Sequence, residues 1–66
     1  MNDDELKRLR RLADKINTAI AETTLALAEV KDSATRAFVA ESLADLQRAW
    51  LILDEKIRAA NKFPTT

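Results

Sequence analysis

Hydrophobic residues recur at alternating steps of three and four along two long stretches of this chain, and this pattern constrains the fold more than any other feature. The first series consists of Leu6, Leu9, Ala13, Ile16, Ile20, Thr23, Leu27 and Val30. The second consists of Val39, Leu43, Leu46, Trp50, Leu53, Ile57 and Ala60. Such spacing places every member on one face of an α-helix, as in coiled coils. The sequence therefore predicts an all-α protein of two amphipathic helices, each with one apolar seam.

The register between the two seams shows that they belong to separate helices. Val30 and Val39 occupy equivalent positions but lie nine residues apart, which is one heptad plus two. A continuous coil accommodates insertions of three or four residues, and not readily of two. The residues between the seams are nearly all polar. We therefore expect a single domain, an antiparallel hairpin with a helix over about 3–31, a turn over about 32–35, a helix over about 35–62 and a tail over 63–66.

Helix-terminating signals flank both predicted helices. Asn2 is a suitable N-cap for the first, because its side-chain oxygen can accept from free amides of the first turn. Asp32 is a plausible N-cap for the second, as are Ser33 and Thr35. The chain contains no Gly, so a left-handed turn residue would have to be Asp, Ser or Lys. Pro64 disfavours helical geometry at the preceding residue, which predicts that the second helix stops near residue 61 or 62.

The size of the chain predicts self-association. A core of fewer than about 70–80 residues rarely supplies more than about 3–5 kcal/mol, and this chain of 66 residues has no Cys for a disulfide. We therefore expect a homodimer that forms a four-helix bundle. The predicted core and dimer residues are Leu6, Leu9, Ile16, Ile20, Leu27, Leu43, Leu46, Leu53 and Ile57.

The residue types that are missing exclude most catalytic chemistry. There is no His and no Cys, so the commonest general base, the thiolate nucleophile and the commonest metal ligands are absent. Without Gly there is no glycine-rich phosphate loop. We expect no enzyme activity, no cofactor and no metal. No apolar run approaches the roughly 18 residues of a membrane span and the chain opens with an acidic segment, so we expect a cytoplasmic protein without a membrane partner.

Some hydrophobic residues of the second helix lie outside its seam. Phe38 and Ile52 are fourteen residues apart and share one angular position, with Leu51 beside Ile52. Together with Trp50, these residues predict a docking patch for another protein. The alternative is that a four-helix dimer uses a second face and buries them.

A basic segment in the first helix predicts a different partner. Residues 7–15 carry five basic side chains and one acidic one, and Arg8, Arg11 and Lys15 lie along one outer ridge. Such a ridge suits a phosphate backbone and allows RNA binding as an alternative function. The simpler interpretation is a solvated helix face with ion pairs at four-residue spacing.

The format of the chain resembles the Rop family of small bacterial plasmid-copy-number regulators. The similarity covers nearly the whole chain in helix lengths, and in residues it consists of Glu41-Ser42-Leu43 and of Phe63. The resemblance implies a hairpin that dimerises into a four-helix bundle and binds RNA hairpins. The first helix departs from the family because it lacks the aromatic residue that the family presents to RNA.

Two further resemblances imply protein partners. With Arg36-Ala37-Phe38 and Trp50-Leu51-Ile52 the chain looks like small phage-encoded inhibitors, including quorum-sensing anti-activators, which cover a host protein surface with short helices. It is also similar to small helical-hairpin accessory proteins linked to nitrogen fixation. The sequence thus predicts a non-catalytic protein-binding module that inhibits or modulates a partner. An RNA-binding regulator and a purely structural oligomerisation element are the alternatives.

Overall fold

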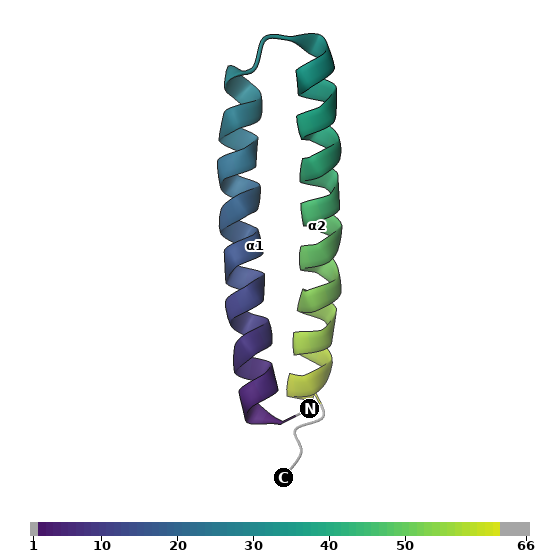
Figure 1. Ribbon diagram of the computed structural model, residues 1–66. Coiled ribbons are helices and arrows are strands. Elements are labelled where there is room, and N and C mark those ends of the chain that lie inside the picture. Colours follow the sequence, from purple (N-terminus) through teal and green to yellow (C-terminus); the bar gives the residue numbers. More distant parts are fainter. Residues whose placement is uncertain (1, 63–66) are drawn as a thin grey trace.

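Two long helices lie side by side and antiparallel, joined by a short turn at one end (Figure 1). The computed structural model describes residues 2–62. Helix α1 spans Asp3–Glu29 and helix α2 spans Ser33–Lys62. The prediction of an all-α helical hairpin is confirmed, and the second helix ends where Pro64 predicts. The predicted tail, residues 63–66, lies outside the described residues.

The start of α1 follows its capping signal. The side-chain oxygen of Asn2 accepts a hydrogen bond from the backbone N–H of Glu5 at 2.8 Å. Asp3, Asp4 and Glu5 fill the first turn, where negative charge complements the positive end of the helix dipole. The role predicted for Asn2 is therefore confirmed.

The turn lies earlier in the chain than predicted. Helix α1 ends at Glu29 and not near residue 31, and α2 begins at Ser33 and not near residue 35. The reason is the early N-cap Asp32, whose carboxylate accepts from the Thr35 backbone N–H at 2.8 Å and from its hydroxyl at 2.6 Å. Val30 is extended, with φ −80° and ψ 126°, and no residue of the described part has a positive φ. The chain therefore turns without a left-handed residue, and the lack of Gly is no obstacle.

The seam residues of the two helices form the contact between them. The nine predicted core residues are all half-buried, as is Trp50, and the most enclosed side chain of the described residues is Ala13, with 8% exposed. A small residue at this point lets the helices approach closely. Within the described residues no large side chain is fully buried. A pair of helices can enclose its seam from two sides only, so the hairpin has a contact layer and no enclosed core.

Candidate protein-binding surface

Large hydrophobic side chains remain exposed on both helices. On α2 the exposed fractions are 70% for Phe38, 55% for Leu51 and 54% for Ile52, and on α1 they are 47% for Leu12 and 70% for Leu25. Three of the four predicted docking residues are therefore at the surface. The fourth, Trp50, is half-buried in the seam and contributes to the contact between the helices. Leu12 and Leu25 extend the exposed apolar surface to α1.

The exposed residues divide between the two flanks of the seam. One flank is marked by a hydrogen bond of 3.1 Å from the Arg10 guanidinium to the Asn61 side-chain oxygen, which joins the helices. Both residues directly follow a seam residue. Leu12 instead directly precedes one, and so do Ala19 and Ala26 on α1 and Ser42 and Ala49 on α2. These five residues therefore line the opposite flank.

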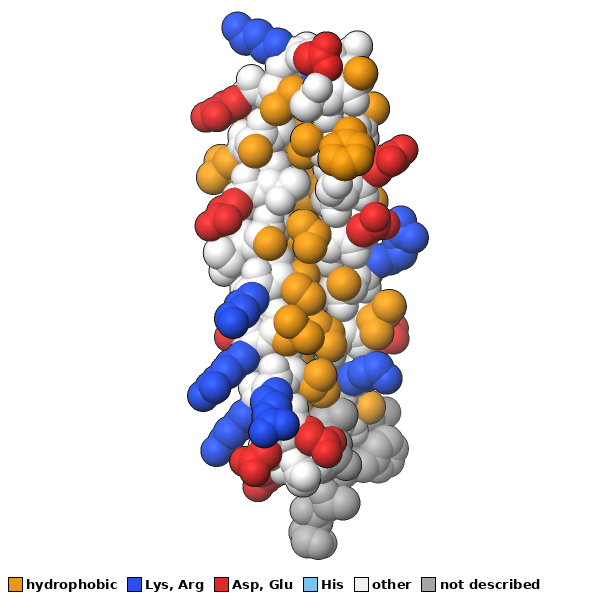
Figure 2. Space-filling model, viewed as in Figure 1, with side chains coloured by type: hydrophobic (Ala, Val, Ile, Leu, Met, Phe, Trp, Pro, Cys, Tyr) orange, Lys and Arg blue, Asp and Glu red, His pale blue; other side chains and the backbone are white. Residues whose placement is uncertain are grey.

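Phe38 and Ile52 extend this opposite flank outward on α2. Phe38 lies four residues before Ser42, and Ile52 three residues after Ala49, which are neighbour spacings on a helix. We call the surface formed by Leu12, Ala19, Ala26, Phe38, Ser42, Ala49 and Ile52 the apolar flank. Figure 2 shows hydrophobic side chains running along the length of the molecule over the line where α1 and α2 meet. Leu51 is rotated by about 100° from Ile52 and belongs to the other flank. The sequence-based patch is therefore split between two faces.

The polar groups of the apolar flank are already satisfied. The Ser42 hydroxyl donates to the Phe38 carbonyl oxygen at 3.2 Å, one turn earlier. No buried side-chain N or O atom within the described residues is left without a hydrogen-bond partner. A protein that covers this flank would therefore displace water from apolar atoms and leave no unpaired polar group behind.

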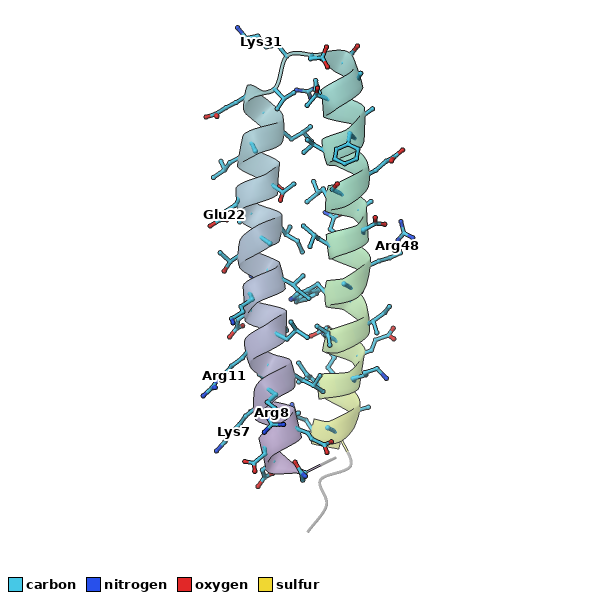
Figure 3. All side chains as sticks on the ribbon, viewed as in Figure 1. Lys7, Arg8, Arg11, Glu22, Lys31 and Arg48 are labelled. Carbon is cyan, nitrogen blue, oxygen red and sulfur yellow. The ribbon has the colours of Figure 1, made fainter. Side chains whose placement is uncertain are left out.

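The basic residues form a separate surface near the start of α1. Lys7, Arg8 and Arg11 line a shallow surface hollow together with Asp4, and Figure 3 shows Lys7 and Arg11 projecting away from α2. Lys15 is exposed further along the same helix. RNA binding by Arg8, Arg11 and Lys15 stays a prediction of the sequence, and α1 supplies no aromatic side chain on which a base could stack.

A residue that the sequence analysis missed connects the turn to both helices. The Arg36 guanidinium donates to the carbonyl oxygens of Leu27 and Val30, each at 2.8 Å. The last turn of α1 contains no basic residue of its own, so Arg36 brings the positive charge that this negative helix end lacks. The signal was its position: Arg36 lies seven residues before the seam residue Leu43 and hence faces α1.

The ionisable side chains of the described residues form ion pairs along α2 and a helix cap. The ion pairs join Asp45 to Arg48 at 3.2 Å and Asp54 to Arg58 at 3.0 Å, both within α2. No three acidic side chains of the described residues cluster as metal ligands would. At Asp32, hydrogen bonds from the Thr35 hydroxyl and backbone N–H lower the pKa of the carboxyl group. This perturbed group is the N-cap of α2 and thus has a structural role.

The chain shows neither a membrane-spanning helix among its described residues nor similarity to a known protein. Neither helix, over the residues described, has an apolar stretch long enough to cross a membrane. Comparison of the chain with protein families, with curated proteins and with solved structures yields no match.

Proposed function

We propose that this chain is a non-catalytic protein-binding module, which homodimerises and inhibits or modulates a partner protein by covering part of its surface. The observation that carries the proposal is the exposure of Phe38, Leu51 and Ile52 on a helix that has no structural need for them. Exposed aromatic and aliphatic side chains grouped on one element are typical of protein contacts. Full burial of each such side chain contributes roughly 1.5–3 kcal/mol.

The mode of action that fits this surface is steric. Helix α2 is 30 residues long and carries its exposed hydrophobic residues over half of that length, from Phe38 to Ile52. Such a helix can lie along a groove or against a helix of the target protein and exclude the target's usual ligand. Neither a bound cofactor nor a reactive side chain is required for this action.

The proposal can be tested with a photo-crosslinking amino acid placed at position 38 or at position 51 of the full chain in its native host. Position 25 is the matched control, since Leu25 is as exposed as Phe38 but lies on α1. We expect covalent adducts from positions 38 and 51, with none from position 25. The adduct at position 51 should contain a different protein, and the labelled chain should keep its helical circular dichroism.

Other results would favour the alternative functions. Adducts that contain only further copies of this chain would indicate a structural oligomerisation element. Retention of the chain on structured RNA at low salt, with a steep salt dependence that is lost in the Arg8→Glu/Arg11→Glu variant, would instead indicate an RNA-binding regulator.

A further inference from the structure

The outer side of α1 carries a ridge of charges whose signs reverse halfway along the helix. Four residues at seven-residue spacing form this ridge: Arg8, Lys15, Glu22 and Glu29. All four are exposed, and Figure 3 shows Arg8 on the front of α1 and Glu22 projecting from α1 away from α2. The seam has the same seven-residue period, so the ridge stays alongside the seam as the helices wind.

The two basic and two acidic residues of this ridge can pair with the same ridge of a second copy that runs in the opposite direction. If a second α1 lies antiparallel across the first, Arg8 meets Glu29 of the second copy and Lys15 meets Glu22. The twofold axis repeats each pair, so four pairs of opposite charge form. In a parallel arrangement of the same two helices, each charge would meet its own copy and all four contacts would be repulsive.

The same axis brings the apolar flanks of two copies into register. On α1, Leu12 then meets the small Ala26 of the second copy, and Ala19 meets its own copy at the axis. On α2, Phe38 meets Ile52 of the second copy. The positions at the axis, near Ala19 on α1 and Asp45 on α2, lie within about 3 Å of the same height above the turn, given a rise of 1.5 Å per residue. Asp45 meets its own copy at this axis, and because its side chain is 74% exposed, this one contact of like charges costs little.

The surface area of the hairpin matches what such a dimer needs. The chain exposes 5385 Å², whereas a compact monomer of 7.4 kDa exposes roughly 4,200 Å². The excess is about 1,200 Å² per chain and roughly 2,400 Å² per pair, which is the size of an obligate homodimer interface. The surface area that an isolated hairpin exposes in excess of a compact monomer is therefore about the area that contact with one more copy would bury.

The other twofold arrangement of two flanks would place α1 of one copy against α2 of the other. The pairs of opposite charge between Arg8 and Glu29 and between Lys15 and Glu22 would then not form, so the charged ridge favours the arrangement with α1 on α1.

We propose that a second copy of this chain covers the apolar flank, with α1 antiparallel on α1 and α2 antiparallel on α2, and that the charged ridge of α1 sets this orientation. The inference rests on the proposed protein-binding function and names the occupant of one flank. Leu51 lies on the other flank and stays exposed in this dimer, where it can contact a different protein.

Charge exchange along the ridge tests the arrangement by sedimentation equilibrium at low salt. The Arg8→Glu/Lys15→Glu variant has four negative charges on the ridge, and the Glu22→Lys/Glu29→Lys variant has four positive ones. We expect each alone to dimerise roughly 30-fold more weakly than the wild type, since four exposed pairs become repulsive. A 1:1 mixture should form heterodimers, and the fourfold variant that combines all changes should dimerise like the wild type.

Circular dichroism of each variant separates lost dimerisation from lost helix, because the exchanged residues lie outside the seam. The proposal would be overturned if the wild-type chain stayed monomeric even at 100 times the protein concentration used for circular dichroism. So would double variants that dimerise normally, or a mixture that fails to form heterodimers. If Phe38→Asp/Ile52→Asp abolishes dimerisation while the charge exchange does not affect it, the antiparallel orientation is wrong. Crosslinking at position 51 does not depend on these results, so the failure of the proposed function would be recognised separately.

Discussion

Replacement of Arg36 by Ala tests whether one side chain holds the turn end of the hairpin together. In the structure its guanidinium donates to two carbonyl oxygens, of Leu27 and Val30, each at 2.8 Å. Hydrogen bonds from a charged donor contribute about 1.5–3 kcal/mol each when they are shielded from water. Arg36 is exposed, so the value must be lowered, and a charge at a helix end adds about 0.3–1 kcal/mol. We expect Arg36→Ala to reduce the free energy of unfolding by about 1–2 kcal/mol.

The measurement is urea denaturation followed by circular dichroism, at one fixed protein concentration because the proposed dimerisation would make stability depend on concentration. The matched control is Arg48→Ala, which removes an exposed Arg from the middle of α2 with only one surface ion pair. That change should cost less than about 0.5 kcal/mol. Arg36→Lys should be less destabilising than Arg36→Ala, because an ammonium group keeps the positive charge. It lacks the planar guanidinium group that donates to two carbonyl oxygens at once, so stability should be only partly restored.

Amide hydrogen exchange locates the effect. The backbone N–H of Val30 donates to the carbonyls of Ala26 and Leu27 at 3.2 and 3.3 Å, at the helix end that Arg36 holds. Its exchange should accelerate in Arg36→Ala and stay unchanged in Arg48→Ala. If Arg36→Ala is no less stable than Arg48→Ala, or if exchange at Val30 does not change, then the reasoning about Arg36 is wrong.

Four further predictions concern the caps and the seam. The Asp32 carboxyl group has a lowered pKa in the folded state. Its contribution to stability is therefore present above the ordinary pKa of an aspartate and is lost as the pH falls through the lowered pKa. In thermal melts recorded at several pH values, Asp32→Asn should reduce this loss of stability at acid pH. Asn2→Ala should cost about 1 kcal/mol in urea denaturation, because the amide of Glu5 loses its acceptor. Ala13→Leu should cost about 1–3 kcal/mol by overpacking the closest helix contact, and a melting temperature no lower than that of the wild type would contradict it. Leu53→Asp places an unpaired charge in the half-buried seam and should abolish the cooperative thermal transition, whereas Ile52→Asp at the exposed neighbouring position should not.

The periodicity of the hydrophobic residues predicted the fold because the fold consists of two amphipathic helices and a short turn. The three-and-four spacing from Leu6 to Val30 marks one helix face, and the nine-residue interval to Val39 requires a break. The position of the turn was less accurate because three residues could each serve as the N-cap. The structure shows that the Asp32 carboxylate accepts hydrogen bonds from Thr35, so that α2 starts two residues earlier than expected.

The sequence predicted which residues of the candidate surface are exposed, but not how they are distributed around the hairpin. The sequence shows that Phe38, Leu51 and Ile52 lie off the seam, and the structure confirms that they are exposed. Their division between two flanks depends on how α1 lies beside α2, which a single-helix pattern does not contain. The role of Arg36 was not predicted because its hydrogen bonds reach back across the turn by nine and six residues, to Leu27 and Val30.

The three-residue turn also determines the order in which this hairpin can form. Contacts between the helices near the turn close a short loop, whereas those near Asn2 and Asn61 close almost the entire chain, so the entropy lost on closure rises steadily with distance from the turn. Folding should therefore propagate from Asp32 and Arg36 towards the open end. In kinetic terms, substitutions at these two residues should slow folding, while Asn2→Ala should mainly speed unfolding.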